Sequence, residues 1–220
     1  YVFRRCTKAK GKVDNAPHPL LKSGKRREGL LMARRVKFDR ESIICAGLDI
    51  VREGGPEALN ARAVAARLGS STQPLYSGVG GMDQLRAQVY ARAAALFNER
   101  MADCHIADTP PYKACGLALL RFANEERALY RLLFLSGAAR VANARECLEE
   151  TSGRAHEAVM AATGYSLETA RAFHRHMFIF VQGMASMIAT GCVAYDEAYC
   201  GAMLNDEYAA LRKLYDARQA

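Results

Sequence analysis

Apolar residues recur every three or four positions along most of the chain from residue 38 onwards. This spacing matches the 3.6-residue turn of an α-helix, so each such segment presents one apolar face. Alternating apolar and polar positions, which would indicate half-buried strands, are nearly absent. The pattern therefore predicts an all-α protein whose helices bury their apolar faces against one another.

Glycine, proline and small polar residues interrupt this spacing and mark the ends of the predicted helices. A first helix carries the apolar stripe 43–51 and stops at "REGGPEAL". The helices predicted after it cover residues 61–68, a short segment ending near Ser77, and residues 82–103, 112–126, 128–135, 143–163, the stretch from a Ser166 cap to about 190, and 196–217.

The sharpest break lies in "ARAVAARLGSSTQPLYSGVGGMDQL", residues 61–85. Asn60 is a good N-cap for the helix that begins there, and Gly69 fits the left-handed position at which that helix ends. Ser70 or Ser71 can cap the next helix, whose first turn tolerates a proline. Two short helices joined by a tight turn after an amphipathic helix form a helix-turn-helix unit. The second helix of such a unit can enter the major groove of DNA.

Residues 40–85, "RESIICAGLDIVREGGPEALNARAVAARLGSSTQPLYSGVGGMDQL", resemble the DNA-binding domain of the tetracycline-repressor (TetR/AcrR) family. The turn glycine, the "LY" after it and the "DQL" of the following helix stand at the family's spacing. The segments "LLRFANEERALYRLLF" (119–134) and "MFIFVQGMASMIATG" (177–191) resemble the ligand-binding half of one branch. The resemblance implies a DNA-binding transcription regulator, usually a repressor, that forms a homodimer through its last two helices. A small apolar or amphipathic effector is expected to release it from an inverted-repeat operator.

Polar side chains around the turn are the candidates for contacts to double-stranded DNA. Gln73 can pair with adenine through its amide, and hydroxyl groups can reach bases or phosphates. The family often has a lysine where this chain has Met82, which leaves the backbone N–H for a phosphate contact. The predicted DNA-binding residues are Lys37, Arg40, Asn60, Arg62, Ser71, Thr72, Gln73, Tyr76, Ser77 and Met82. Helix capping, core packing or a solvated surface charge would also explain individual members.

The net charge of +8 is concentrated at the N-terminus. Residues 1–37 hold 12 Lys and Arg against 2 Asp and Glu and show no apolar period, which predicts a basic, disordered arm. Met32 opens a stretch typical of a natural protein start, so residues 1–31 are interpreted either as part of the arm or as upstream sequence. The predicted domains after the arm are a helix-turn-helix domain at 38–84 and a helical ligand-binding and dimerisation domain at 85–220.

Aromatic and methionine residues at helical spacing in the second half could line a cavity for the effector, since methionine adapts to varied apolar surfaces. Arg121, His174 and Gln182 stand on otherwise apolar faces and could orient a ligand. The predicted cavity residues are Phe97, Met101, Arg121, Phe122, Phe134, Phe173, His174, Met177, Phe178 and Gln182. The alternative for most of them is an ordinary place in the core.

Other classes of function find little support in the sequence. No uncharged apolar run reaches the about 18 residues of a membrane span, no secretory signal is visible, and a cytoplasmic protein is expected. No nucleophile elbow, phosphate-binding loop or H-E-x-x-H motif indicates an enzyme, and no cofactor is expected. Seven cysteines without a C-x-x-C pair predict reduced thiols, and Cys104 beside His105 is a weak basis for a metal site. The alternative to a regulator is a helical adaptor that binds nucleic acid or anionic membrane through the basic arm without sequence preference.

Overall fold

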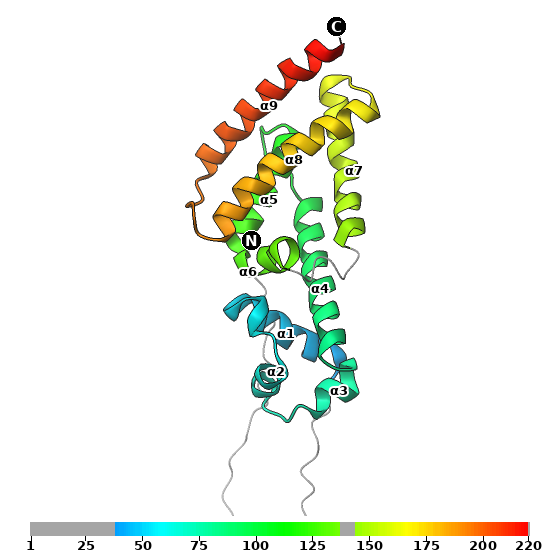
Figure 1. Ribbon diagram of the computed structural model, residues 1–220, viewed down its shortest axis with the longest axis vertical. Helices are drawn as coiled ribbons and strands as arrows, with labels where there is room; N and C mark the ends of the chain where they lie inside the picture. Colours follow the sequence, from blue (N-terminus) through cyan, green and yellow to red (C-terminus); the bar gives the residue numbers. More distant parts are fainter. Residues whose placement is uncertain (1–37, 137–143, 220) are drawn as a thin grey trace, which may run out of the picture. The chain divides into compact units, whose positions relative to one another are not determined.

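The computed structural model describes residues 38–136 and 144–219, so the predicted arm and Lys37 lie outside the described residues (Figure 1). Within the described ranges the chain is helical and has no strand, which confirms the all-α prediction. The helices belong to one compact unit. None of them is both long enough and apolar enough to cross a membrane.

The first three helices, with a short 3-10 turn between the first two, are α1 (Arg40–Gly54), η1 (Pro56–Ala58), α2 (Ala61–Leu68) and α3 (Gln73–Val79). Asp39 caps α1, because its carboxylate accepts a hydrogen bond of 2.7 Å from the Ser42 N–H. α1 buries the predicted apolar stripe and packs on α2, α3 and the fourth helix. Gly47 permits the close approach to the fourth helix, since a Cβ there would stand 2.7 Å from Val89 Cγ2.

The turn between α2 and α3 has the predicted geometry. The Asn60 side chain accepts a hydrogen bond of 3.0 Å from the Ala63 N–H and so caps α2. Gly69 ends the helix with φ 61° and ψ 35°, a left-handed conformation that costs glycine little. A Cβ at Gly69 would contact nothing within 4 Å, so the backbone conformation rather than crowding favours glycine. The next N–H, from Ser70, closes on the Ala65 carbonyl at 3.0 Å, which completes a compact helix end.

α3 is two residues longer than predicted. The expected end near Ser77 is wrong because Val79 is also buried, at 6% exposure, and continued packing extends the helix through Gly78. The turn that follows consists of Gly80 and Gly81, whose φ values of 84° and 106° are both positive. This turn leads directly into the fourth helix.

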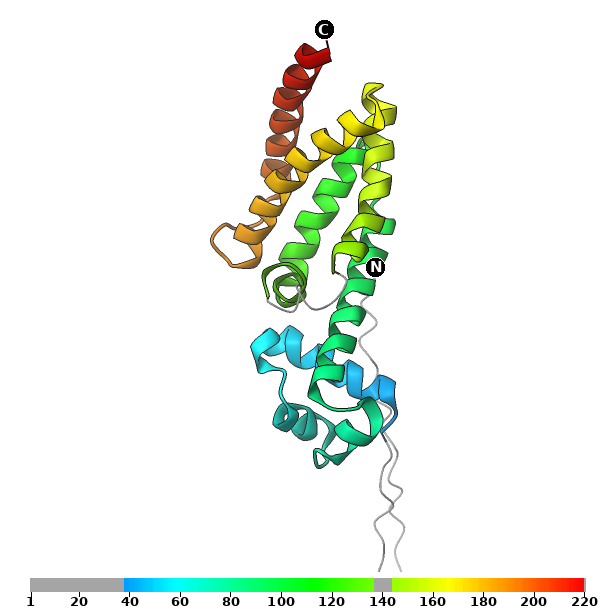
Figure 2. The same cartoon turned by 45° about the vertical axis from the view of Figure 1, so that its right-hand side comes forward.

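The remaining elements are α4 (Met82–Ala102), α5 (Pro111–Glu125), α6 (Arg127–Tyr130), the π-helical turn η2 (Arg131–Leu135), α7 (Ala144–Thr163), α8 (Leu167–Ala189) and α9 (Glu197–Gln219). α4 runs without a break from the helix-turn-helix into the larger bundle (Figures 1 and 2). The predicted domain boundary at 84/85 falls in its first turn. The side chain of Ser166 caps α8, as predicted, by accepting from the Thr169 N–H at 3.2 Å.

The segment 128–135 is not the single helix that was predicted. α6 has four residues and continues as the π-helical turn η2. Leu129, Tyr130, Leu132 and Leu133 are all buried there, which is more than one α-helical stripe accommodates. α6 packs on α1, α5 and α8, so this segment is buried on several sides, and the wider π-helical turn occurs where it is buried.

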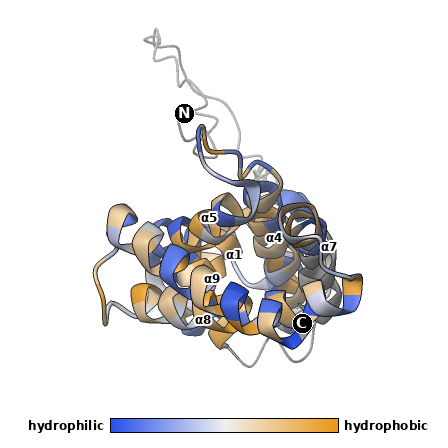
Figure 3. Cartoon of the chain, turned by 90° about the horizontal axis from the view of Figure 1, so that it is seen from above, coloured by the Kyte–Doolittle hydropathy of each residue, from blue (hydrophilic) through white to orange (hydrophobic). Residues whose placement is uncertain are grey.

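The larger bundle has an aromatic core between α8 and α9. Phe173 of α8 is fully buried, and its ring lies 5.3 Å from that of Tyr208 and 5.5 Å from that of Tyr215, both on α9. Tyr165 and Tyr112 complete the cluster at 6.0 and 6.3 Å from Phe173. Seen from above, α4, α5, α7, α8 and α9 stand around the centre of the bundle (Figure 3).

Candidate functional site

α3 presents a protruding polar face. Leu75 and Val79 anchor the helix at 2% and 6% exposure, whereas Tyr76 on the other side is 63% exposed. Gln73 and Ser77 are exposed too, and Gln73 lies three residues before Tyr76 and four before Ser77, so it neighbours both on the helix surface. The side chains that were predicted to read DNA therefore point into solvent and not beneath neighbouring helices.

The small hydroxyl residues around α3 already have partners in the backbone. Ser71 Oγ accepts a hydrogen bond from the Gln73 N–H at 3.4 Å, just before the helix begins. Ser77 Oγ donates to the Gln73 carbonyl at 3.2 Å. Thr72 occupies the N-cap position, is half-buried and makes no capping bond. Gln73 and Tyr76 are thus the members of the predicted set that extend furthest from the helix with their functional groups uncommitted to capping.

The flanking residues predicted to contact DNA lie at helix starts. Arg62 is exposed in the first turn of α2, and no ion pair holds it among the residues that the structure describes. Arg40 opens α1, and its Nε donates to Gln88 Oε1 at 2.8 Å. Asn60 is exposed but occupied as a cap. Met82 begins α4, whose N-terminal N–H groups have no side-chain cap.

The helix-turn-helix has few positive charges to spare. Residues 38–86 contain five Lys and Arg against six Asp and Glu. Three of the arginines are held in ion pairs: Arg52 with Glu126, Arg67 with Glu53 and Arg86 with Asp83. Binding to phosphates strengthens with the number of cations near the duplex, so this surface needs help from elsewhere in the chain.

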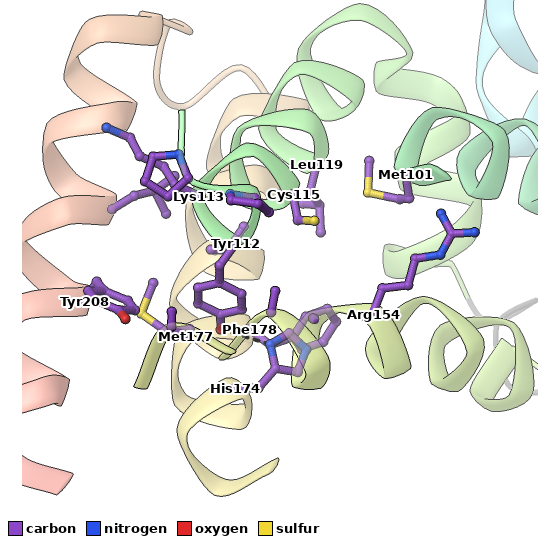
Figure 4. Close-up of a pocket in the computed structure, with 18 of the residues that line it drawn as sticks. Met101, Tyr112, Lys113, Cys115, Leu119, Arg154, His174, Met177, Phe178 and Tyr208 are labelled. Atoms are coloured by element: carbon purple, nitrogen blue, oxygen red, sulfur yellow. Dashed lines mark hydrogen bonds between the residues drawn. The ribbon is translucent and has the colours of Figure 1, made fainter. Parts of the chain in front are cut away.

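A cavity of about 520 Å³ lies within the larger bundle (Figure 4). Residues of α4, α5, α7, α8 and α9 line it, together with Pro110, and most of the lining is apolar. Its volume is in the range of small-molecule sites. Five of the ten predicted cavity residues are brought together there: Phe97, Met101, His174, Met177 and Phe178.

Three aromatic residues of the predicted set lie outside this cavity. Phe173 is fully buried in the aromatic core against Tyr112 and Tyr208, which themselves line the cavity. Phe122 and Phe134 stack edge-on against Phe97, each with a ring separation of 5.2 Å, and so form the layer behind the cavity wall. Helical spacing marked all three correctly as inward-facing, but neighbouring side chains cover them.

Two polar residues of the predicted set also lie outside the cavity. Arg121 pairs with Glu197 of α9, with Nε donating to Oε2 at 3.0 Å. Gln182 accepts a hydrogen bond from the buried hydroxyl of Tyr130. Both side chains therefore bond to another residue of the protein, because leaving a polar group unpaired on an apolar face would lower the stability of the fold.

A smaller cavity of about 130 Å³ opens beside the turn after α4. Arg121 and Phe122 line it together with Cys104 and His105. Among the residues described, no three His, Cys, Asp or Glu side chains gather so that they could hold a metal ion.

Several residues of the large cavity were not predicted. Tyr112, Lys113 and Cys115 come from the first two turns of α5, Arg154 from α7 and Tyr208 from α9. The paired prolines at the start of α5 were a signal that its first turn is held in place. α7 escaped prediction because it lines the cavity mainly with alanines, which carry no distinctive chemistry.

His174 and Tyr112 form a polar pair in the middle of this cavity (Figure 4). The Tyr112 hydroxyl lies 3.0 Å from His174 Nδ1, and the ring of His156 stands edge-on at 5.1 Å. Burial, and then the neighbouring His156, lowers the pKa of His174 to about 4. Burial also raises the pKa of Tyr112. At neutral pH the imidazole is uncharged and the phenol keeps its proton, so this pair offers hydrogen bonds without adding charge.

Acidification should destabilise the protein through His174. Its pKa of about 4 in the folded state lies below the ordinary histidine value of 6.5, so the unfolded chain takes up the proton first. The free energy of unfolding therefore falls as pH drops from about 6.5 towards 4, by on the order of 3 kcal/mol at most. Urea unfolding across this window would measure the loss, which His174→Gln should reduce. His105→Gln, at an exposed histidine, is the control, and equal pH dependence in both variants would contradict the assignment.

Comparison of the sequence with protein-family models gives no match, and no curated protein matches it. The structure, in contrast, is similar to solved structures. One is a TetR-like transcriptional regulator from Rhodococcus sp. RHA1, 18% identical, with a TM-score of 0.56 over 77% of this chain and 93% of that one. Another is a TetR-family member from Streptomyces coelicolor A3, 21% identical, with a TM-score of 0.52 over 76% of this chain and 96% of that one. The chain therefore has the TetR fold, with an N-terminal helix-turn-helix followed by a larger helical domain.

Proposed function

We propose that the protein is a ligand-responsive transcription regulator that binds an inverted-repeat DNA site as a homodimer. The observation that carries this proposal is the continuity of α4 between two features. At one end α4 packs on α3, the helix that carries the protruding polar face. At its other end, Met101 and Ala102 of α4 line the cavity. A polar face for a duplex and an apolar cavity for a small molecule are the two sites that such a regulator needs.

An exposed apolar surface on the last two long helices supports the dimer. Ile179 and Met187 of α8 are 63% and 49% exposed, and Tyr199 and Leu214 of α9 are 56% and 42% exposed. Gly183 lies between the two exposed α8 side chains, and a Cβ there would meet nothing within 4 Å. Such a surface favours burial against a second copy, and the small residue lets two helices approach closely.

Coupling between the cavity and α3 has a second route beside α4. Arg52 of α1 binds Glu126 at the start of α6 through two hydrogen bonds, of 3.0 and 2.8 Å. The Glu126 side chain is only 12% exposed, so this paired geometry is held more firmly than a surface ion pair. A ligand that shifts α4 or α6 would carry α1 with it, and α1 supports α2 and α3.

The proposed mechanism is a population shift. Two α3 helices in a dimer must be about 34 Å apart to enter successive major grooves. A ligand that binds better to a dimer with another separation lowers the DNA affinity by the difference in its binding free energies. Repression of genes near its own is the mode that we propose.

The test of this function is a gel shift of the full chain with DNA from around its own gene. We expect one retarded complex at dimer stoichiometry that survives an excess of random DNA at moderate salt. Deleting residues 1–31 should weaken this complex but leave its specificity and its dimer stoichiometry unchanged, because counterion release supplies affinity without sequence preference. Equal affinity for random DNA, or binding lost entirely with the arm, would favour the nonspecific adaptor.

The cavity should prefer an apolar ligand that carries a negative or neutral polar group. Lys113 and Arg154 line it, and no Asp or Glu stands among the described residues of its lining. Lys113 makes no ion pair among the residues described, whereas Arg154 donates to the Ala102 carbonyl at 3.4 Å. An anionic group entering here would meet two cations and no carboxylate, so a cationic drug would be disfavoured.

Two fluorescent probes separate this charge preference from mere apolar binding. Anilinonaphthalene sulfonate carries an anionic group, and N-phenylnaphthylamine is its neutral counterpart. Lys113→Gln should weaken sulfonate binding roughly fivefold and leave the neutral probe unchanged, as expected for a partly exposed charge interaction. Lys213→Gln, at an exposed lysine on α9, is the matched control. Equal weakening of both probes would refute the charge preference.

A further inference from the structure

Two thiols meet where α4 ends and α5 begins. Cys104 follows Asp103, the C-cap of α4, and Cys115 lies in the second turn of α5. Their Sγ atoms are 3.1 Å apart, about 1 Å more than the length of an S–S bond. We propose that Cys104 and Cys115 form an oxidisable dithiol, which a hydroperoxide converts into an intramolecular disulfide. This inference does not depend on the proposed DNA binding.

The environment assigns different roles to the two sulfurs. Burial, and then the hydrogen bond with Cys104, raises the pKa of Cys115 to about 12. Cys115 therefore keeps its proton at neutral pH. Cys104 lines the smaller cavity and is therefore the first nucleophile, and Cys115, whose proton is held, resolves the intermediate.

An oxidant can reach Cys104 from the smaller cavity. Cys104 is half-buried and lines that cavity of about 130 Å³ together with Arg100, His105 and Arg121. Asp103 is the carboxylate in the same lining. Cys115 lines the large cavity on the other side, so the dithiol stands in the wall between the two spaces. A hydroperoxide is small and uncharged enough to enter the smaller one.

The reaction proceeds in two steps that balance. The Cys104 sulfur attacks one peroxide oxygen, an S–O bond forms as the O–O bond breaks, and water or an alcohol leaves with the thiol proton. The Cys115 sulfur then attacks Cys104 Sγ, the S–S bond forms as the S–O bond breaks, and the sulfenic oxygen leaves as water with the Cys115 proton. The two thiols are oxidised by two electrons together, and the peroxide is reduced.

The product would join the end of α4 to α5 covalently. α4 is the helix that connects the cavity wall to the helix-turn-helix, and the turn between Cys104 and Cys115 is the connection that leads out of it. Oxidation would remove freedom from this connection and leave the protruding face of α3 untouched. The modification would thus act on the same helix as the proposed effector but at a different place.

The test treats the reduced full chain with hydrogen peroxide and maps the products after trypsin digestion. Cleavage after Arg100, Lys113 and Arg121 puts the two cysteines in separate peptides, 101–113 and 114–121. We expect a disulfide-linked pair of these peptides, the loss of two of the seven thiols, and full recovery of both with dithiothreitol. Cys192→Ser, at an exposed thiol, should form the same link at the same rate.

Two further variants test the order of the steps. In Cys115→Ser, the sulfenic acid on Cys104 cannot be resolved, so dimedone should label peptide 101–113. In Cys104→Ser, peptide 114–121 should stay unlabelled at the same dose. The proposal is overturned if peptides 101–113 and 114–121 remain unlinked in the wild-type chain at a dose that oxidises Cys192. Labelling of peptide 114–121 in Cys104→Ser would overturn the assignment of the first nucleophile.

Discussion

The double variant Gln73→Ala, Tyr76→Ala is expected to lower affinity for a specific DNA site by about 100-fold or more. Each good contact from a side chain to a base edge contributes about 1–3 kcal/mol of discrimination, and about 1.4 kcal/mol corresponds to a factor of ten. Both side chains are exposed, and Tyr76 at 63% exposure contributes little to the core. The free energy of unfolding should therefore change by less than about 0.5 kcal/mol.

Gel shift titration against a specific and a random duplex measures this effect, and urea unfolding checks that the fold is intact. Glu157→Gln, at an exposed residue of α7, is the control for a surface substitution far from α3. Tyr76→Phe then separates the hydroxyl from the ring. If the double variant binds the specific site as tightly as the wild type, α3 is not the reading element.

Phe173→Ala is expected to destabilise the protein by about 3–5 kcal/mol. The ring is fully buried, and four tyrosine rings surround it at distances between 5.3 and 6.3 Å. Truncating such a side chain loses its transfer free energy and leaves a cavity that a packed aromatic cluster fills poorly. Loss of the edge-to-face contacts adds to the cost.

Urea or thermal unfolding at one fixed protomer concentration measures this loss, because the proposed dimer would make stability depend on concentration. Phe178→Ala, five residues further along α8, is the matched control. Phe178 is half-buried and borders the cavity, so its removal enlarges a space that already exists and should cost clearly less. Equal losses for the two variants would contradict the distinction between core and cavity wall.

Local signals in the sequence predicted the helix-turn-helix correctly. Asn60 and Gly69 act on their own backbone within a few residues, and so does the Ser166 cap. Their effect needs no distant partner, which is why the bounds of α2 were predicted to the residue. The end of α3 was missed by two residues because it depends on the packing of Val79, a tertiary contact.

Membership of the large cavity could be predicted only in part. Phe97, Phe122, Phe134 and Phe173 all recur at helical spacing, yet only Phe97 borders the cavity. Periodicity shows which side of a helix faces inward, but a cavity is the space that all the facing helices leave unfilled. The alanines of α7 help to leave that space, and nothing in their own sequence distinguishes them from alanines that close a gap.

The sequence by itself determined the helical class, the turn at Gly69 and the concentration of charge in the first 37 residues, since these follow from backbone preferences and composition. Only the tertiary structure decided which polar residues are free. Arg121 and Gln182 are satisfied by Glu197 and Tyr130, which lie 76 and 52 residues away in the chain. Cys104 and Cys115 likewise meet only in the folded chain, where the end of α4 and the start of α5 lie next to each other. Pairing between side chains depends on distance in space, which helical spacing within one segment does not encode.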